Sequence, residues 1–118
     1  MPSSTGGNLV HINPILNVSD LQASIAFYTE VVGFNLLDTF GDPADYGIIR
    51  WDQHEIYLCQ NGQGQPGTWL TLFVTEPAAL YRQLVANDVE VLMPYPDGGG
   101  EFRVVDPDGH VLRVFSGS

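Results

Sequence analysis

The chain has no lysine, a single cysteine and no long apolar run, and each shortage excludes a class of protein. Its 118 residues contain four arginines against 14 aspartates and glutamates, which gives a formal net charge of −10. Nucleic acid and anionic membranes are poor partners for such a surface, whereas a cationic ligand would be favoured. Acidity that serves only solubility would give the same composition.

Membrane-spanning and secretion signals are also missing. No apolar run is long enough to cross a bilayer. The segment from Met1 to Asn8 carries neither a positive charge nor an apolar stretch, so we interpret it as a loose tail rather than a signal peptide. Cys59 stands alone, which excludes a disulfide framework and predicts a cytoplasmic location. We interpret this cysteine as a small buried strand residue.

What the sequence does contain is one unit that recurs after 56 residues. Leu16-Asn17-Val18-Ser19 returns as Leu72-Phe73-Val74-Thr75, and Ile56-Tyr57-Leu58 returns as Leu112-Arg113-Val114. A period of this length predicts two similar supersecondary units that face each other across a pseudo-twofold axis. We therefore expect a ligand to bind in a cup between the two units.

Each unit is predicted to contain a strand, a helix and three further strands within one domain. Modules of about 9–60 and 68–116 are joined by a Gly- and Gln-rich linker over 61–67. Alternation and turn residues predict strands over 10–18, 34–40, 46–51, 55–60, 68–74, 89–93, 101–105 and 111–115. The segment from Asp106 to Gly109 is expected to form a tight turn.

The helices are predicted from capping residues and helical spacing. Ser19 is the expected N-cap of the first helix and Gly33 its C-terminal stop. Thr75 is the expected cap of the second, with Pro77 at an early position. The apolar faces are expected to consist of Leu21, Ile25, Tyr28 and Val32 in the first helix, and of Leu80, Leu84 and Val85 in the second.

The strands carry two different kinds of side chain on their two faces. Aliphatic residues that would lie under the helices are Leu16, Val18, Ile56, Leu58, Leu70, Leu72, Val74, Leu112 and Val114. The alternate positions mix aromatic and polar groups, and we call them the cup residues: Asn13, Glu55, Tyr57, Trp69, Thr71, Phe73, Arg113 and Phe115. Because burying unpaired polar groups costs ~2–7 kcal/mol each, a binding surface explains this face better than a second core.

Several segments of the chain resemble a known superfamily. They are Ile15 to Leu21, Phe27-Tyr28 through Val32-Gly33-Phe34, and Glu101 to Gly109. The chain is similar, from about Val10 to Phe115, to the glyoxalase/bleomycin-resistance/extradiol-dioxygenase group, the vicinal-oxygen-chelate superfamily. This resemblance implies an α+β fold in which two paired βαβββ modules form a curved mixed sheet around a cup, with the helices outside and a homodimer as the usual assembly.

The resemblance also implies where a metal would be bound. Enzymes of the group, such as glyoxalase I, hold a divalent metal with residues from the first and last strand of each module, and these positions fall on Asn13, Tyr57, Trp69 and Arg113. Tryptophan cannot coordinate a metal and arginine brings its own positive charge. We therefore expect neither a metal nor another cofactor.

Other constellations in the sequence support an enzyme poorly. A displaced metal site could use His11 and Glu55. The alternative is that His11 is a polar group with satisfied hydrogen bonds at the start of its strand. His54 and His110 adjoin turns, and we interpret them as turn residues. Cys59 has no obvious partner base, and no spacing supports Glu55 and Glu101 as an acid/base pair.

An aromatic pocket without metal ligands resembles the bleomycin-resistance branch, whose members are not enzymes and sequester an antibiotic. Trp69 and the Glu101-Phe102 pair are similar to that branch, whereas Arg113 and the segment 97–100 depart from it. We expect a metal-free, dimeric protein that binds an aromatic ligand, with a cationic antibiotic or another natural product as options and no catalytic residues. The alternatives are an enzyme with displaced metal ligands and a binding module for an ordinary metabolite.

Overall fold

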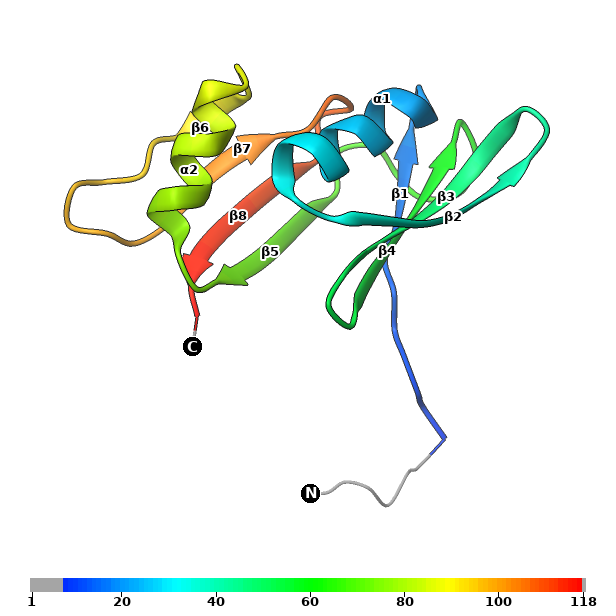
Figure 1. The fold of residues 1–118 in the computed structure, drawn as a ribbon, viewed down its shortest axis with the longest axis horizontal. Coiled ribbons are helices and arrows are strands. Elements are labelled where there is room, and N and C mark those ends of the chain that lie inside the picture. Colours follow the sequence, from blue (N-terminus) through cyan, green and yellow to red (C-terminus); the bar gives the residue numbers. More distant parts are fainter. Residues whose placement is uncertain (1–7, 118) are drawn as a thin grey trace.

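The computed structural model, which describes residues 8–117, consists of two four-stranded sheets lying side by side (Figure 1). The first module contains β1 (Ile15–Val18), α1 (Leu21–Ala26), the π-helix η2 (Phe27–Val32), β2 (Asn35–Gly41), β3 (Ala44–Trp51) and β4 (His54–Gln60). The second contains β5 (Trp69–Val74), α2 (Pro77–Ala86), β6 (Glu90–Met93), β7 (Phe102–Val105) and β8 (Val111–Ser116). The predicted α+β class and the two βαβββ modules are confirmed.

The two sheets have the same topology, which explains the repeat in the sequence. Their strand orders are β1-β4-β3-β2 and β5-β8-β7-β6, with a parallel pair at the start of each. Leu16 lies opposite Leu58 in the first sheet, and the corresponding Leu72 lies opposite Val114 in the second. Residues at equivalent points of the repeat therefore occupy equivalent points of the two sheets.

Both helices lie on the same side of the molecule and cover the aliphatic faces of the sheets (Figure 1). The predicted core residues Leu16, Val18, Leu58 and Val114 are fully buried. Leu70, Leu72 and Val74 of β5 are half-buried against the same core. Because alternate strand residues point to opposite faces, the predicted cup residues on these strands lie on the faces away from the helices.

The first helix begins one residue later than predicted and changes its winding. Asp20, not Ser19, is the N-cap, because its side chain accepts a hydrogen bond from the Ala23 amide. From Phe27 onward the helix is a π-helix, and the Gly33 amide donates to the Tyr28 carbonyl at 3.0 Å. Gly33 ends the helix with a φ of 122°, as expected of a glycine there.

The second helix corrects two further expectations. Its N-cap is Glu76 rather than Thr75, and no side chain caps it, although Pro77 stands at the first turn as predicted. Leu80 and Leu84 face the core, but Val85 is 46% exposed. Leu80 and Leu84 are four residues apart and so share one face, whereas Val85 lies about 100° around the helix from Leu84.

The first strand is shorter than its apolar pattern predicted. The sequence indicated a strand over 10–18, but β1 pairs with β4 only from Ile15 onward. The preceding residues run away from the sheets as an extended segment (Figure 1), and Leu9, Val10 and Ile12 are exposed. Asn8 apart, the predicted loose tail lies outside the described residues.

The turn from Asp106 to Gly109 joins the two modules as well as two strands. The Asp106 carboxylate is buried and accepts hydrogen bonds from the Tyr28 hydroxyl and from the amides of Asp108 and His110. Asp108 accepts from the backbone amide of Ser19 at 2.8 Å. This turn is therefore one contact of the second module with the helix of the first, and the Gln83 side chain of α2 supplies another by donating to the Val31 and Val32 carbonyls. Within the described residues, no helix has the length and apolar character that a bilayer crossing needs.

Candidate functional site

The eight predicted cup residues fall into two groups, one on each module. Asn13, Glu55 and Tyr57 belong to the first module, with Tyr57 and Glu55 on β4. The second group lies on the two neighbouring strands β5 and β8 and consists of Trp69, Thr71, Phe73, Arg113 and Phe115. Parallel pairing places Thr71 beside Arg113 and Phe73 beside Phe115. The contacts that join the cup residues run within each group.

The second group forms a continuous row of aromatic rings and guanidinium groups. Phe73 and Phe115 are stacked, with ring centroids 5.6 Å apart and planes inclined by 24°. The guanidinium carbon of Arg113 lies 5.0 Å from the Phe115 ring centre, and that of Arg103 lies 5.4 Å from the Trp69 ring centre. Such contacts are cation–π interactions. The two outer rings, Trp69 and Phe73, are 54% and 69% exposed and are open to a ligand.

Glu101 joins the two arginines of this row. Its Oε2 accepts from Nε of Arg103 at 2.6 Å and from Nε of Arg113 at 2.8 Å. These hydrogen bonds lower the pKa of the Glu101 carboxyl to about 2, and they raise that of Arg113. Glu101 is therefore ionised at neutral pH and pairs with two guanidinium groups, which do not lose their proton in proteins. We call Trp69, Phe73, Glu101, Arg103, Arg113 and Phe115 the arginine–aromatic face.

The first group carries weaker contacts of a different kind. The Asn13 amide lies 3.4 Å from the Tyr57 hydroxyl, and the Tyr57 ring packs edge-on against Tyr46 at 6.0 Å. Partial burial, with Cys59 and Tyr57 nearby, raises the pKa of the Tyr46 hydroxyl. Glu55 accepts from Arg50 at 3.0 Å. This sheet therefore offers neutral aromatic and amide groups beside one ion pair.

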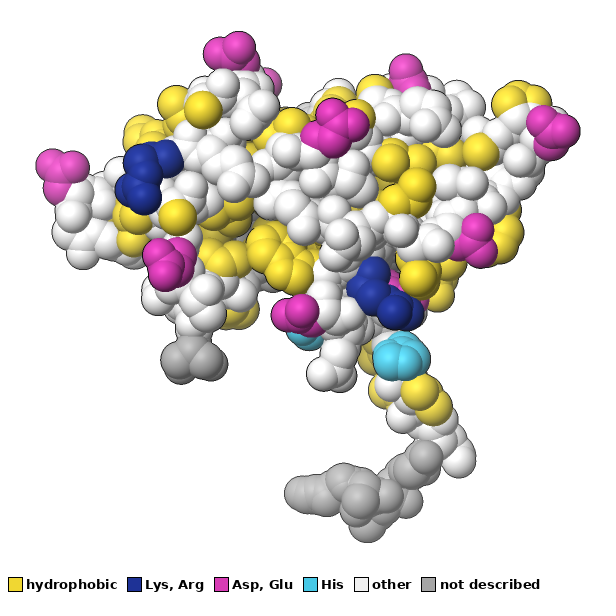
Figure 2. All heavy atoms as spheres, in the orientation of Figure 1, with side chains coloured by type: hydrophobic (Ala, Val, Ile, Leu, Met, Phe, Trp, Pro, Cys, Tyr) yellow, Lys and Arg dark blue, Asp and Glu magenta, His cyan; other side chains and the backbone are white. Residues whose placement is uncertain are grey.

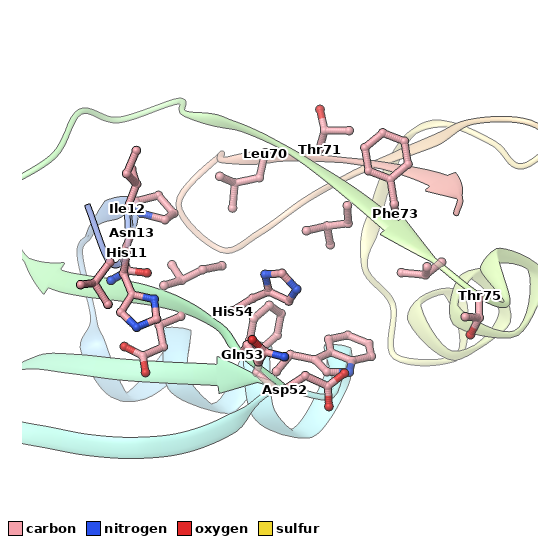
Figure 3. A pocket seen from close by; sticks show the side chains of 18 residues that line it. His11, Ile12, Asn13, Asp52, Gln53, His54, Leu70, Thr71, Phe73 and Thr75 are labelled. Carbon is pink, nitrogen blue, oxygen red and sulfur yellow. The ribbon is translucent and has the colours of Figure 1, made fainter. Parts of the chain in front are cut away.

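A cleft of about 810 Å³ lies between the two modules, next to this first group. Its walls are the extended segment 10–14, Phe34, the β3–β4 turn and its flanks (51–56), and residues 70–75 of β5 and its end. Four cup residues line it, namely Asn13, Glu55, Thr71 and Phe73. In Figure 3, Leu70 and Thr71 project to opposite sides of β5, and Figure 2 shows apolar atoms exposed between the modules. Strand β5 thus borders both the cleft and the arginine–aromatic face, and Phe73 belongs to both.

The side chains at the four metal positions do not fit a divalent metal. Trp69 has no lone pair to offer, and Arg113 is a cation held by Glu101. The Asn13 amide group points at the Tyr57 hydroxyl. Both of these residues belong to the first module, whereas Trp69 and Arg113 belong to the sheet of the second. Among the residues the structure describes, no three His, Cys, Asp or Glu side chains come together in a group that could hold a metal ion. The absence of a bound metal stays a prediction.

The remaining catalytic candidates have structural environments of their own. Glu55 and Glu101 pair with different arginines in different modules. His11 is exposed and lines the same cleft as Glu55, and His54 is the exposed first residue of β4. His110 is fully buried, and both of its ring nitrogens have partners. Its Nδ1 accepts from the Thr68 amide at 2.9 Å, and its Nε2 lies 2.7 Å from the Asn17 carbonyl oxygen. Sequence reasoning placed His110 beside a turn but missed this bridging role.

Sequence reasoning also missed Arg103. The signal was present, because Phe102 and Val104 are both buried on β7 and the residue between them must face the other way. Antiparallel pairing then places Arg103 directly opposite Arg113. The sequence places Glu101 close to Arg103, but it does not show that this carboxylate is the common partner of two arginines.

The family model of the Glyoxalase/Bleomycin resistance protein/Dioxygenase superfamily matches residues 8–114. The chain belongs to this superfamily. The match spans both modules as far as Val114 in β8, and it includes every cup residue except Phe115. No curated protein sequence matches the chain significantly.

Solved structures of related fold agree with this assignment. TioX from Micromonospora sp. ML1 is similar with a TM-score of 0.79 and 15% identity, over 89% of this chain and 96% of that protein. A bleomycin resistance determinant encoded on the transposon Tn5 has a TM-score of 0.72 and 22% identity, over 93% and 99% of the two chains. A bleomycin-binding protein complexed with bleomycin has a TM-score of 0.70 and 20% identity, over 93% and 100%. At these identities the likeness concerns the fold.

Proposed function

We propose that this protein is a metal-free binding protein that sequesters a small aromatic natural product, such as an antibiotic, in drug resistance or self-protection. The observation that carries the proposal is the arginine–aromatic face, where two exposed rings flank a charged network. Two of its residues, Trp69 and Arg113, stand at positions that enzymes of the superfamily would give to metal ligands. Exposed aromatic rings cost hydrophobic free energy unless a ligand covers them. The similar fold of a bleomycin-binding protein supports a binding role.

The rival proposal, a metal-dependent enzyme with displaced ligands, rests on His11 and Glu55. Both line the cleft, but Glu55 already pairs with Arg50, which competes for its lone pairs. A binding module for an ordinary metabolite would use the same surfaces as the favoured function and differs from it only in the ligand.

We further propose that the protein acts as a C2 homodimer with two equivalent ligand sites. β1 and β5 are edge strands of their sheets, and the apolar side chains of Leu9, Val10 and Ile12 are exposed next to β1. A second chain would cover both the edges and the apolar segment. Sedimentation equilibrium at micromolar concentration should give the dimer mass, and a monomer mass would count against this assembly.

A thermal-shift screen of aromatic natural products, including cationic antibiotics, tests the proposed function. Because a ligand that binds only the folded state stabilises it by mass action, one or more compounds should raise the melting temperature in a concentration-dependent way. A screen in which only ordinary metabolites stabilise the protein would favour the metabolite-binding alternative.

Elemental analysis of protein purified without chelator separates the binding proposals from the enzyme. We expect no stoichiometric transition metal. About one tightly bound metal per chain would support the rival instead, since functional sites of this type bind tightly.

A further inference from the structure

The arginine–aromatic face carries a positive charge in a chain that is strongly negative as a whole. The chain has only four arginines, and two of them, Arg103 and Arg113, lie directly opposite each other on β7 and β8. The carboxylate of Glu101 is bonded to both. Two guanidinium groups and one carboxylate leave a net charge of +1 on these three residues.

Placing Arg103 opposite Arg113 does not stabilise the sheet. Like charges opposite each other on antiparallel strands destabilise a sheet, and a single carboxylate neutralises only one of the two arginines. A hydrophobic or oppositely charged pair at these positions would serve folding better. Departures of this kind from what folding favours are typical of functional sites.

The two guanidinium groups are also held in place before any ligand arrives. Arg103 lies over Trp69 and uses its Nε for Glu101, and Arg113 lies over Phe115 and uses its Nε and Nη2 for the same carboxylate. An arginine has five N–H donors, so both side chains keep donors for a further acceptor. Fixed side chains lose little entropy on binding.

We infer that the arginine–aromatic face binds a planar aromatic carboxylate, with the ring system against Trp69 or Phe73 and the carboxylate on the remaining N–H groups of Arg103 and Arg113. This inference rests on the proposed function and names the chemical class of its ligand. It reverses the expectation from net charge that the ligand is cationic. Charges beyond about 8 Å are largely screened at physiological ionic strength, so the arginines in contact with the ligand outweigh the distant carboxylates.

Three probes of one shape test the inference: 2-naphthoate, its neutral carboxamide and the cationic 2-(aminomethyl)naphthalene. Isothermal titration calorimetry gives their affinities, and the indole N–H signal of Trp69 in NMR spectra reports whether they bind at this face. We expect 2-naphthoate to bind more tightly than the ammonium compound by about tenfold or more, which is about 1.4 kcal/mol. Its affinity should fall as salt is added.

Matched arginine variants show which positive charges are responsible for the preference for the carboxylate probe. Arg103→Gln and Arg113→Gln should each remove most of the preference for the carboxylate. Arg82→Gln, on the exposed surface of α2, changes the net charge by the same amount and should leave the preference intact. Thermal melting confirms that each variant is folded.

Some outcomes would overturn the inference without touching the proposed function. Equal affinities for the three probes, or tighter binding of the ammonium compound, would show that the face binds aromatic compounds but does not select carboxylates. If no probe binds and shifts the Trp69 signal, the inference fails as well. The natural-product screen then still decides the proposed function by itself.

Discussion

The hydroxyl group of Tyr28 donates a 2.7 Å hydrogen bond to Oδ2 of Asp106, and this contact ties the helix of the first module to the β7–β8 turn of the second. Both residues are buried, and the Tyr28 ring packs edge-on against Phe27 and Phe34. Burial and the neighbouring Asp106 carboxylate raise the pKa of Tyr28 well above its ordinary value. Tyr28 therefore remains a hydrogen-bond donor throughout the physiological pH range.

Replacing this tyrosine with phenylalanine should destabilise the protein measurably. Tyr28→Phe keeps the ring but removes the donor, and a hydrogen bond to a charged group contributes about 1.5–3 kcal/mol. Urea denaturation should show a loss of this size in the free energy of unfolding. Tyr81→Phe is the control, because its ring also packs in an aromatic cluster while no hydrogen bond of its hydroxyl is found within residues 8–117. Equal effects of the two variants would contradict a special role for the Tyr28 hydroxyl.

His110 should be present as the neutral Nε2–H tautomer. Its Nδ1 accepts a hydrogen bond from the Thr68 amide, so the proton must be on Nε2, which then donates to the Asn17 carbonyl. Long-range 1H–15N correlation spectra distinguish the two tautomers directly. His54, which is exposed, provides the comparison within the same spectrum. A Nδ1–H form of His110 would mean that the bridge from Thr68 to Asn17 is not formed as described.

The ion pairs of Glu101 should make a contribution to stability that is lost only in strong acid. The pKa of Glu101 is lowered to about 2 in the folded protein, from an ordinary 4.5. Its contribution is therefore complete above about pH 4.5 and declines as the pH falls towards 2. The difference in unfolding free energy between the wild type and Glu101→Gln should shrink over that interval. A difference that stays constant from pH 5 to 2 would show that the ionised carboxylate is not what matters.

Trp69 should matter more for binding than for folding. Because the side chain is 54% exposed, Trp69→Ala removes much less buried surface than a core substitution would, and the protein should stay folded with only a moderate fall in melting temperature. Loss of the stacking ring should weaken a natural-product ligand by about tenfold, or about 1.4 kcal/mol. Trp51→Phe leaves Trp69 as the only tryptophan, so quenching of its fluorescence can be followed on titration. If Trp69→Ala unfolds the protein, the side chain belongs to the core instead.

The sequence predicted most of the fold because each element has a local pattern that does not depend on its neighbours. Alternating residues defined the faces of β4, β5 and β8, and the repeat related the two sheets. The exceptions depend on distant partners. Residues 10–14 have a strand-like pattern, but β1 reaches only as far as its pairing with β4. The π-helix could not be predicted from the sequence either, because its apolar residues are also compatible with the spacing of an ordinary α-helix.

The candidate site could be predicted only in part. The alternation of side chains along the strands identified Trp69, Phe73 and Arg113 as neighbours on one face, because that follows from strand register alone. It could not show that Arg103 reaches across to Trp69, nor that Glu101 bonds to two arginines. Those contacts depend on side-chain conformation across three strands. The net charge of the chain averages over the whole surface, so it does not give the charge at one face.

The separation of the two sheets bears on how this protein can evolve. Each sheet has its own ladder of backbone hydrogen bonds, and the side-chain hydrogen bonds between the modules involve Tyr28, Gln83, Asp106, Asp108 and His110 rather than shared strands. A substitution on the outward face of one sheet therefore leaves the register of the other unchanged. After a duplication, one copy of the unit can acquire arginines while the other retains amide and phenol groups. Such a chain can change the compound it recognises one half at a time.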